Sequence, residues 1–338
     1  MRVFVTGSTG FLGINLCKEL VKRGYTVNAL YRSGDKANYL KTGNIHLFKG
    51  DVTDIKSLEK AMLNCEYVFH LAAYAQVWAK NPGTFYDINY TGVLNVLNVA
   101  AKVGVKKIIV TSTAGVFGPS EHSIINEESK RQVDYFSLYE STKAEAEKLI
   151  SERAAQGLNV VIVNPSRIYG PGLLSTSNGV TRLIRLYIKG NFRILPGNGK
   201  SIGNYVYIDD VVNGHILALE NGKAGERYIL GGENVSYIDF FKTLSEVSAK
   251  KYSLFRFPVF LMLFVSNIML IAAKLFGIKP LITPGLIKKY NYNWEISSNK
   301  AQTELGYNIT PLKTGIIKTI DFLVAEKLLV LNKGFSKT

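Results

Sequence analysis

The chain has 338 residues, of which 47% are hydrophobic, so it is longer than one average domain and can bury a large core. Its 41 Lys and Arg residues outnumber 26 Asp and Glu, but they form no nucleic-acid-binding motif, and we expect no nucleic acid partner. Four histidines and two cysteines are scattered without the spacing of metal ligands, so no metal site is expected. The few cysteines, and a first strand that begins directly after Met1, predict a cytoplasmic protein without a signal peptide.

A glycine-rich loop follows the first predicted strand. Residues 2–6 (RVFVT) form a short apolar run typical of a buried parallel strand, and residues 11–23 have the pattern of a helix. The glycines between them let the backbone turn tightly and approach a pyrophosphate, whose charge would lie on the N–H groups at the start of the helix. We therefore expect a dinucleotide cofactor here. The residues expected to hold it are Gly7, Thr9, Gly10, Phe11, Leu12 and Gly13.

The second predicted strand, residues 26–32 (TVNALYR), ends in a basic residue. It offers no Asp or Glu for a ribose 2′-hydroxyl, whereas Arg32, followed by Lys36, can bind a 2′-phosphate. We therefore expect NADP(H) as the cofactor. NAD(H) is the alternative, which applies if Arg32 is only a solvated surface cation.

Further buried strands are expected at residues 45–48, 67–73 and 107–111, and a long apolar helix is expected to begin at Asn89. Strands that alternate with helices in this way predict an α/β fold with a doubly wound parallel sheet of the Rossmann type. His70, at the end of one strand, is more typical of a core histidine than of a catalytic base.

Tyr139 and Lys143 stand four residues apart in LYESTK, which places both side chains on one face of a helix. The ammonium would favour the phenolate and lower the pKa of the tyrosine from its usual value of about 10. A tyrosine tuned in this way can give or take a proton at a carbonyl or carbinol oxygen. The spacing alone is common on helix surfaces, but the glycine-rich loop makes this pair a candidate active site.

Several segments, in the same order along the chain, resemble signatures of the extended short-chain dehydrogenases/reductases, also called the NAD-dependent epimerase/dehydratase family. They are TGSTGFLG (6–13), GDVT (50–53), HLAA (70–73), STAGVFG (112–118), LYESTK (138–143) and NPSRIYGPG (164–172). The resemblance covers nearly the whole chain.

The resemblance implies catalytic roles. Tyr139 would be the general acid/base, and Lys143 would tune its pKa and hold the ribose. Thr113 would position the substrate oxygen, with Ser112 as the alternative because one residue of register decides which hydroxyl faces the cofactor. Asn89 would support a water-mediated proton path to the lysine.

The same resemblance implies further contacts. Those to the cofactor would come from Asp51 and Val52 at the adenine, from Leu71, Ala72, Ala73 and Thr111 near the pyrophosphate and ribose, and from Pro165 and Ser166 at the nicotinamide. The substrate would be a small molecule contacted by Tyr74, Trp78, Thr113 and Arg167, although the two aromatic residues would suit a core equally well.

The resemblance also implies a division of the chain. Residues 1–163 and 203–230 would form the NADP-binding Rossmann domain. Residues 164–202 and 231–338 would form a smaller, interleaved substrate-binding region. We also expect a homodimer.

Residues 257–273 carry no charge but are flanked by basic residues. This stretch is short for a bilayer span, which needs about 20 apolar residues. We expect a buried helix of the substrate-binding region. A peripheral membrane contact is the second interpretation and a transmembrane span the third.

Two differences from the family's sequence pattern narrow the range of reactions expected for this chain. Ala114 and Gly115 replace the Asp-Glu pair with which sugar dehydratases of this family remove water. Gly203 and Asn204 replace the Arg-Asp with which nucleotide-sugar epimerases bind diphosphate, although arginines at 182, 185 and 193 are available as substitutes.

The remaining features resemble the dihydroflavonol-reductase-like group, which includes hopanoid-associated sugar-epimerase-like proteins. We expect an NADP(H)-dependent oxidoreductase that moves a hydride between the nicotinamide and a secondary alcohol or ketone carbon. The alternatives are an NAD-dependent nucleotide-sugar epimerase and a non-catalytic NADP-binding protein.

Overall fold

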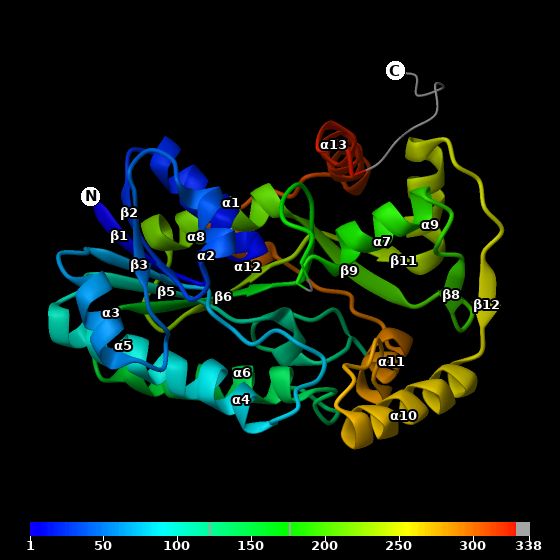
Figure 1. The fold of residues 1–338 in the computed structure, drawn as a ribbon, viewed down its shortest axis with the longest axis horizontal. Helices are drawn as coiled ribbons and strands as arrows, with labels where there is room; N and C mark the ends of the chain where they lie inside the picture. Colours follow the sequence, from blue (N-terminus) through cyan, green and yellow to red (C-terminus); the bar gives the residue numbers. More distant parts are fainter. Residues whose placement is uncertain (122, 176, 329–338) are drawn as a thin grey trace.

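The computed structural model describes residues 1–121, 123–175 and 177–328. Its main element is a seven-stranded sheet in the order β10-β6-β5-β4-β1-β2-β3, in which all neighbours are parallel (Figure 1). The strands are β1 (Arg2–Thr6), β2 (Thr26–Tyr31), β3 (Ile45–Lys49), β4 (Tyr67–His70), β5 (Lys107–Thr111), β6 (Val160–Pro165) and β10 (Arg227–Leu230). The strand order reverses between β1 and β4, which confirms the doubly wound sheet and marks the crevice where ligands bind in such folds.

Helices cover both faces of this sheet (Figure 1), which is why its central strands consist almost entirely of buried apolar residues. Residues 160–163 of β6, for example, are fully buried. One face is covered by α1 (Phe11–Lys22), α8 (Ile208–Asn221) and α12 (Asn299–Leu305). The other is covered by α3 (Ile55–Met62), α5 (Gly92–Val103) and α6 (Leu138–Ala155).

The remaining elements gather beyond the carboxyl ends of the strands. A small sheet has the order β11-β9-β7, and a two-stranded sheet pairs β12 with β8. These strands are β7 (Arg167–Tyr169), β8 (Ile194–Pro196), β9 (Ile202–Tyr207), β11 (Glu233–Ser236) and β12 (Phe255–Phe257). The helices are α7 (Gly179–Ile188), α9 (Tyr237–Ser248), α10 (Val259–Phe276), α11 (Pro284–Asn291) and α13 (Leu312–Ala325). The proposed division into two domains stays a prediction.

The apolar stretch at 257–273 does form a helix, α10, but the expectation that it is buried is wrong. Only Ser266 and Ala273 of this helix are buried. One side packs against α11, and its other large apolar side chains are not covered by the described residues. Composition predicted the helix but could not show that it lies at the edge of the fold.

The helix expected to begin at Asn89 starts earlier and is interrupted. A short helix, α4 (Gly83–Tyr86), continues into a π-helical turn over Asp87–Thr91, and α5 follows. Asn89 therefore lies inside the π turn. Such turns are rare and are frequently found at functional sites.

Candidate functional site

The loop between β1 and α1 has the geometry of a phosphate cradle. Gly7 has a φ of +64°, and a Cβ there would lie 2.7 Å from the backbone of Leu71 and Ala72. A Cβ on Gly13 would lie 2.2 Å from the Gly7 carbonyl oxygen. Glycine at both positions lets the loop pack against the start of α1 and against the end of β4. No side chain of the described residues caps the start of α1, so its N–H groups are available to a pyrophosphate.

At the ends of β2 and β3, the structure brings together Arg32 and Asp51, whose side chains form an ion pair of 3.6 Å. The other carboxylate oxygen of Asp51 accepts hydrogen bonds from the backbone and hydroxyl of Thr53, at 3.0 and 2.9 Å. Asn95 donates to the carbonyl of Val52 at 3.0 Å and fixes the neighbouring backbone. Arg32 remains 68% exposed, so this pair is a weak one that a phosphate can displace.

Lys36 lies nearby on the short helix α2 (Gly34–Ala37) and is exposed. Arg32 and Lys36 therefore stand at the same end of the sheet as Asp51, where the adenosine of a dinucleotide is expected to lie.

The end of β4 forms the floor of the cradle. The Thr6 hydroxyl lies 2.8 Å from Nδ1 of His70 and accepts a hydrogen bond from the backbone of Ala72 at 3.1 Å. Burial, with a smaller contribution from the charge of Lys143, lowers the pKa of His70 to about 3. The imidazole is therefore neutral at physiological pH and acts as a core residue, as the sequence indicated.

Thr113 follows β5 and begins a 3₁₀ turn, Ala114–Phe117, in which its hydroxyl accepts a hydrogen bond from Gly115 at 3.1 Å. Its carbonyl accepts a hydrogen bond of 3.2 Å from the side chain of Asn164 at the end of β6. Thr113 is half-buried, whereas the neighbouring Ser112 is buried. This difference favours Thr113 as the hydroxyl that can reach a ligand.

Lys143 connects α6 to the end of β5, because its ammonium donates a 2.7 Å hydrogen bond to the Thr111 carbonyl. Burial lowers the pKa of Lys143 to about 8, although the carboxylate of Glu147 opposes this effect. The lysine is therefore a buried cation next to the position expected for the cofactor.

The expectation that Lys143 lowers the pKa of Tyr139 is wrong for this structure. Burial raises the pKa of Tyr139 well above its usual value near 10.0, and the charge of Glu140 raises it further. No hydrogen bond joins the side chains of Tyr139 and Lys143 within the described chain. Desolvation of the phenolate therefore outweighs the attraction of the ammonium, and the tyrosine is held as the protonated phenol.

Asn89 is fully buried and links two parts of the site. Its side-chain oxygen accepts a hydrogen bond from the backbone of Tyr74 at 2.8 Å, and its side-chain nitrogen donates to the hydroxyl of Thr142 at 3.1 Å. Asn89 thereby holds the segment after β4 against α6, and its contact on α6 is Thr142, the residue before Lys143. The Tyr74 ring packs edge-on against Phe85, with centroids 4.9 Å apart, and Trp78 is half-buried.

Arg167 lies at the start of β7, directly after Pro165 and the half-buried Ser166. Its guanidinium lies over the rings of Tyr205, Tyr237 and Tyr290, 5.2 to 5.6 Å from their centroids. Nη1 donates to the Tyr237 hydroxyl at 3.0 Å, whereas the buried Nη2 has no hydrogen-bond partner among the described residues.

Glycine at position 203 makes room for this arginine, because a Cβ there would lie 2.3 Å from Nη1 of Arg167. The three tyrosines come from β9, α9 and α11, which are far apart in the sequence. Sequence reasoning therefore identified the arginine but missed the tyrosines around it.

Sequence reasoning also missed a charged network beside Tyr139. The buried carboxylate of Glu140 pairs with Arg131 at 3.1 Å and with Lys289 of α11 at 2.7 Å. These contacts hold α11 and the segment before α6 in place around the tyrosine. The local signals are the glutamate next to a candidate tyrosine and Arg131 nine residues before it, whereas Lys289 is 149 residues away in the sequence.

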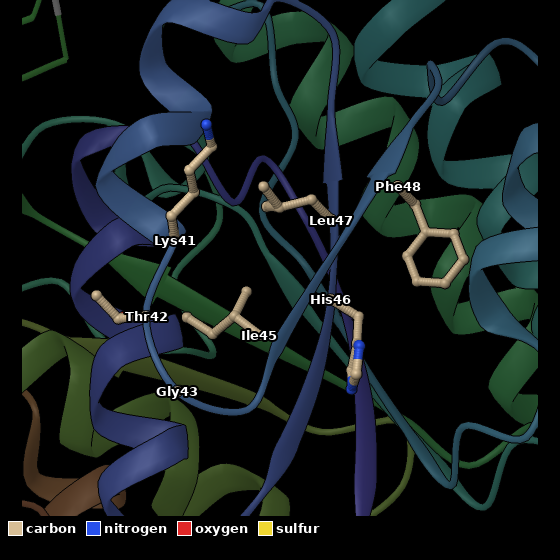
Figure 2. A pocket seen from close by; sticks show the side chains of 7 residues that line it. All are labelled: Lys41, Thr42, Gly43, Ile45, His46, Leu47 and Phe48. Atoms are coloured by element: carbon tan, nitrogen blue, oxygen red, sulfur yellow. The ribbon is translucent and has the colours of Figure 1, made fainter.

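A cavity of about 550 Å³ lies outside this site, along β3 and the preceding turn (Figure 2). Ile45 and Leu47 point to one side of the strand, whereas His46 and Phe48 point to the other (Figure 2). Because the side chains do not converge, and none of the candidate catalytic residues is among them, we do not assign this cavity a function.

The cradle, the parallel sheet and the helix with Tyr139 and Lys143 define the class of the protein as a nicotinamide-dinucleotide enzyme. A sequence profile of the NAD dependent epimerase/dehydratase family matches residues 3–231. The chain therefore belongs to this family and is an NAD(P)-dependent enzyme.

Its relatives include both reductases and epimerases. A dihydroflavonol 4-reductase-like protein of Synechocystis sp. is 29% identical, over 99% of this chain and 96% of the relative. The 3beta-hydroxysteroid-dehydrogenase/decarboxylase isoform 1 of Arabidopsis thaliana is 27% identical, over 94% of this chain and 78% of the relative. Among solved structures, the UDP-glucose 4-epimerase of Thermotoga maritima is 25% identical, with a TM-score of 0.81, over 97% of this chain and 100% of the epimerase.

Proposed function

We propose that the protein is an NADP(H)-dependent oxidoreductase that interconverts a secondary alcohol and a ketone. The observation that carries this proposal is the arrangement at the end of β5, where the Thr111 carbonyl holds the Lys143 ammonium at 2.7 Å on the helix that carries Tyr139. Thr113 lies two residues after Thr111, just beyond the end of β5. The relatives named as reductase and dehydrogenase over nearly the whole chain support the same reaction class.

In the direction of reduction, Tyr139 would donate its phenolic proton to the carbonyl oxygen of the substrate. The raised pKa of Tyr139 keeps the phenol protonated until that step. Lys143, with a pKa of about 8, is mostly protonated at neutral pH and would stabilise the phenolate that forms. Thr113 would donate a hydrogen bond to the same oxygen. The nicotinamide, when bound, supplies or accepts the hydride.

The cofactor that co-purifies with the protein tests this proposal. We expect exchangeable NADPH, and oxidation of NADPH in the presence of a suitable ketone. Tightly held NAD, with a sugar epimerised and no net change in the cofactor, would instead support the epimerase. That second candidate is kept because a UDP-glucose 4-epimerase has the same fold over 97% of this chain.

Arg32→Ala is expected to weaken NADPH binding much more than NADH binding, because only NADPH carries the 2′-phosphate. Loss of a charged hydrogen bond should cost about 1.5–3 kcal/mol, which is roughly a 10- to 150-fold loss of affinity. Fluorescence titration with both cofactors measures the difference. Arg153→Ala, at the far end of α6, is the control, and equal losses for NADPH and NADH would contradict the assignment of Arg32.

For the substrate, we propose that Arg167 binds an acidic group close to the reacting alcohol. The buried Nη2 lacks a partner in the described chain, and a carboxylate can accept from Nη1 and Nη2 together. The Arabidopsis relative named as a hydroxysteroid dehydrogenase/decarboxylase is consistent with a hydroxy acid, because decarboxylation requires a carboxyl group.

Arg167→Gln is therefore expected to remove a preference for hydroxy acids over their methyl esters. A panel of secondary alcohols, assayed as acid and ester, gives the ratio of the two kcat/KM values. We expect this ratio to fall about 10-fold or more in the variant, from the loss of a charged hydrogen bond. An unchanged ratio, in a variant with normal thermal stability and NADPH affinity, would show that Arg167 serves only to pack the tyrosines.

A further inference from the structure

Helix α10 exposes apolar side chains on the side where a surface helix of a soluble protein would expose polar ones. Figure 1 shows it at the edge of the molecule, next to α11. Lys274 is its only charged residue. An amphipathic surface helix turns charged and polar side chains outward, but α10 exposes large apolar ones instead. They include Phe260, Phe264, Ile268, Ile271, Leu275 and Phe276.

This surface concentrates the exposed apolar residues of the protein. Of the 23 large hydrophobic side chains that are exposed in the described chain, 11 lie between Phe255 and Leu281. Single exposed apolar residues are ordinary, but a contiguous group marks a surface that meets a partner or a membrane. We call the exposed side chains from Phe255 to Leu281 the α10 surface.

The charges in the sequence before and after α10 have one sign. Between Glu246 and Glu295 the chain contains seven Lys and Arg residues and no Asp or Glu. Lys289 pairs with Glu140, but the other six form no ion pair with any described residue. They are Lys250, Lys251, Arg256, Lys274, Lys279 and Lys288.

We propose that the α10 surface docks on a membrane that contains anionic lipids. Apolar side chains of an interfacial helix enter the boundary between headgroups and acyl chains, and flanking cations bind anionic headgroups. Helix α10 provides the apolar side chains, and the segment that contains it provides the cations.

A second copy of the chain fits this surface less well. In a two-fold dimer the same surface faces itself, so the unpaired cations of one copy would lie opposite those of the other, with no acidic residue in the segment to compensate. Anionic lipid supplies the missing negative charge.

A transmembrane span also fits less well. By length and composition alone α10 is able to cross a membrane, but its 18 residues rise only about 27 Å, at the lower limit for a bilayer core of about 30 Å. Asn267 and Lys274 lie within the helix, and α10 packs against α11. The helix therefore suits a position parallel to the membrane.

The α10 surface adjoins the substrate side of the enzyme. Helix α11, against which α10 packs, carries Tyr290 over the Arg167 guanidinium and Lys289 on Glu140. Docking through α10 would therefore place the membrane beside the candidate substrate site.

Vesicle flotation with the full chain tests the proposal. We expect binding to vesicles of phosphatidylcholine with phosphatidylglycerol at low salt, weaker binding at high salt because the ionic attraction is screened, and little binding to phosphatidylcholine alone. Absence of binding to the anionic vesicles would overturn the proposal. Retention of the protein in vesicles after carbonate extraction would overturn it too, because a peripheral protein is released.

A matched pair of variants locates the contact. Phe264→Asp places a carboxylate at the middle of α10, and Leu63→Asp does the same after α3, at a similarly exposed residue (64% and 60%). We expect Phe264→Asp to lower binding to anionic vesicles about tenfold or more, and Leu63→Asp to leave it nearly unchanged. Equal binding of both variants to anionic vesicles would overturn the assignment. A wild-type dimer in sedimentation equilibrium that the Phe264→Asp substitution dissociates would overturn it as well. NADPH affinity serves as the check that each variant is folded.

Discussion

Replacing Tyr139 with phenylalanine is expected to lower turnover by about 10²–10⁴-fold, the usual contribution of a general acid. The variant keeps the ring that packs at the start of α6 but loses the only proton that this side chain can donate. Because burial and Glu140 favour the protonated phenol, wild-type Tyr139 is ready to act as an acid before the reaction begins. NADPH affinity should change little, since the lysine that would hold the ribose remains. Single-turnover kinetics with a cofactor titration separate the two effects.

Tyr135→Phe is a suitable control for this experiment. Tyr135 lies just before α6 and its ring packs under the Arg131 guanidinium, 4.4 Å from the ring centroid, a contact that phenylalanine retains. We expect the control to have nearly normal turnover. If Tyr139→Phe retained activity within a few-fold of the wild type, another group would have to donate the proton, and Tyr139 would not be the catalytic acid.

The parts of the site that were predictable from the sequence are those fixed by local backbone requirements. At Gly7 a positive φ and the close approach of β4 exclude any side chain, and this requirement is visible as a glycine directly after a strand. The parallel strands were predictable for a similar reason, because strands covered on both faces are continuous apolar runs. These features need no knowledge of the rest of the fold.

The pKa of Tyr139 and the position of α10 were mispredicted because both depend on tertiary structure. The four-residue spacing placed Lys143 and Tyr139 on one helix, but it could not show how strongly burial would oppose the phenolate. The apolar composition of α10 is equally compatible with a buried helix and a membrane-facing one. What differs is which elements pack around it, and that is set by segments far away in the chain.

The surroundings of Arg167 illustrate the same limit at the site itself. Its sequence position after β6 marked it as a substrate residue, but Tyr205, Tyr237 and Tyr290 come from three separate elements. Their convergence surrounds the guanidinium with aromatic rings and leaves its buried Nη2 without a hydrogen-bond partner among the described residues. Only the folded structure therefore suggests that the substrate carries an acidic group.

The Lys143→Met variant is expected to be more stable than the wild type at neutral pH, although it loses activity. Lys143 is only 2% exposed, and burial lowers its pKa from an ordinary value of 10.5 to about 8. This difference corresponds to a penalty of at most about 3 kcal/mol for holding the charged lysine in the folded protein. The variant also loses the hydrogen bond to Thr111, which lowers its stability by about 1 kcal/mol. The expected net gain in the free energy of unfolding is therefore about 2 kcal/mol. Activity should fall, because the variant has no ammonium to stabilise the phenolate or to hold the ribose.

The pH dependence of this gain identifies its cause. Below pH 8 the folded wild type carries the buried charge and the full penalty applies. As the pH rises from about 8 to 10.5, the folded protein releases the proton before the unfolded chain does, so the wild type becomes more stable and the advantage of Lys143→Met shrinks. Urea denaturation at pH 7 and pH 10 measures both values. Lys107→Met is the comparison: burial also lowers the pKa of Lys107, but this lysine is only half-buried and donates to the carbonyls of Leu219 and Gly222, so we expect a smaller change with pH. Two results would contradict this explanation: a Lys143→Met variant less stable than the wild type at pH 7, or a gain in stability that is the same at both pH values. Either result would show that the charge of Lys143 does not lower the stability of the folded protein.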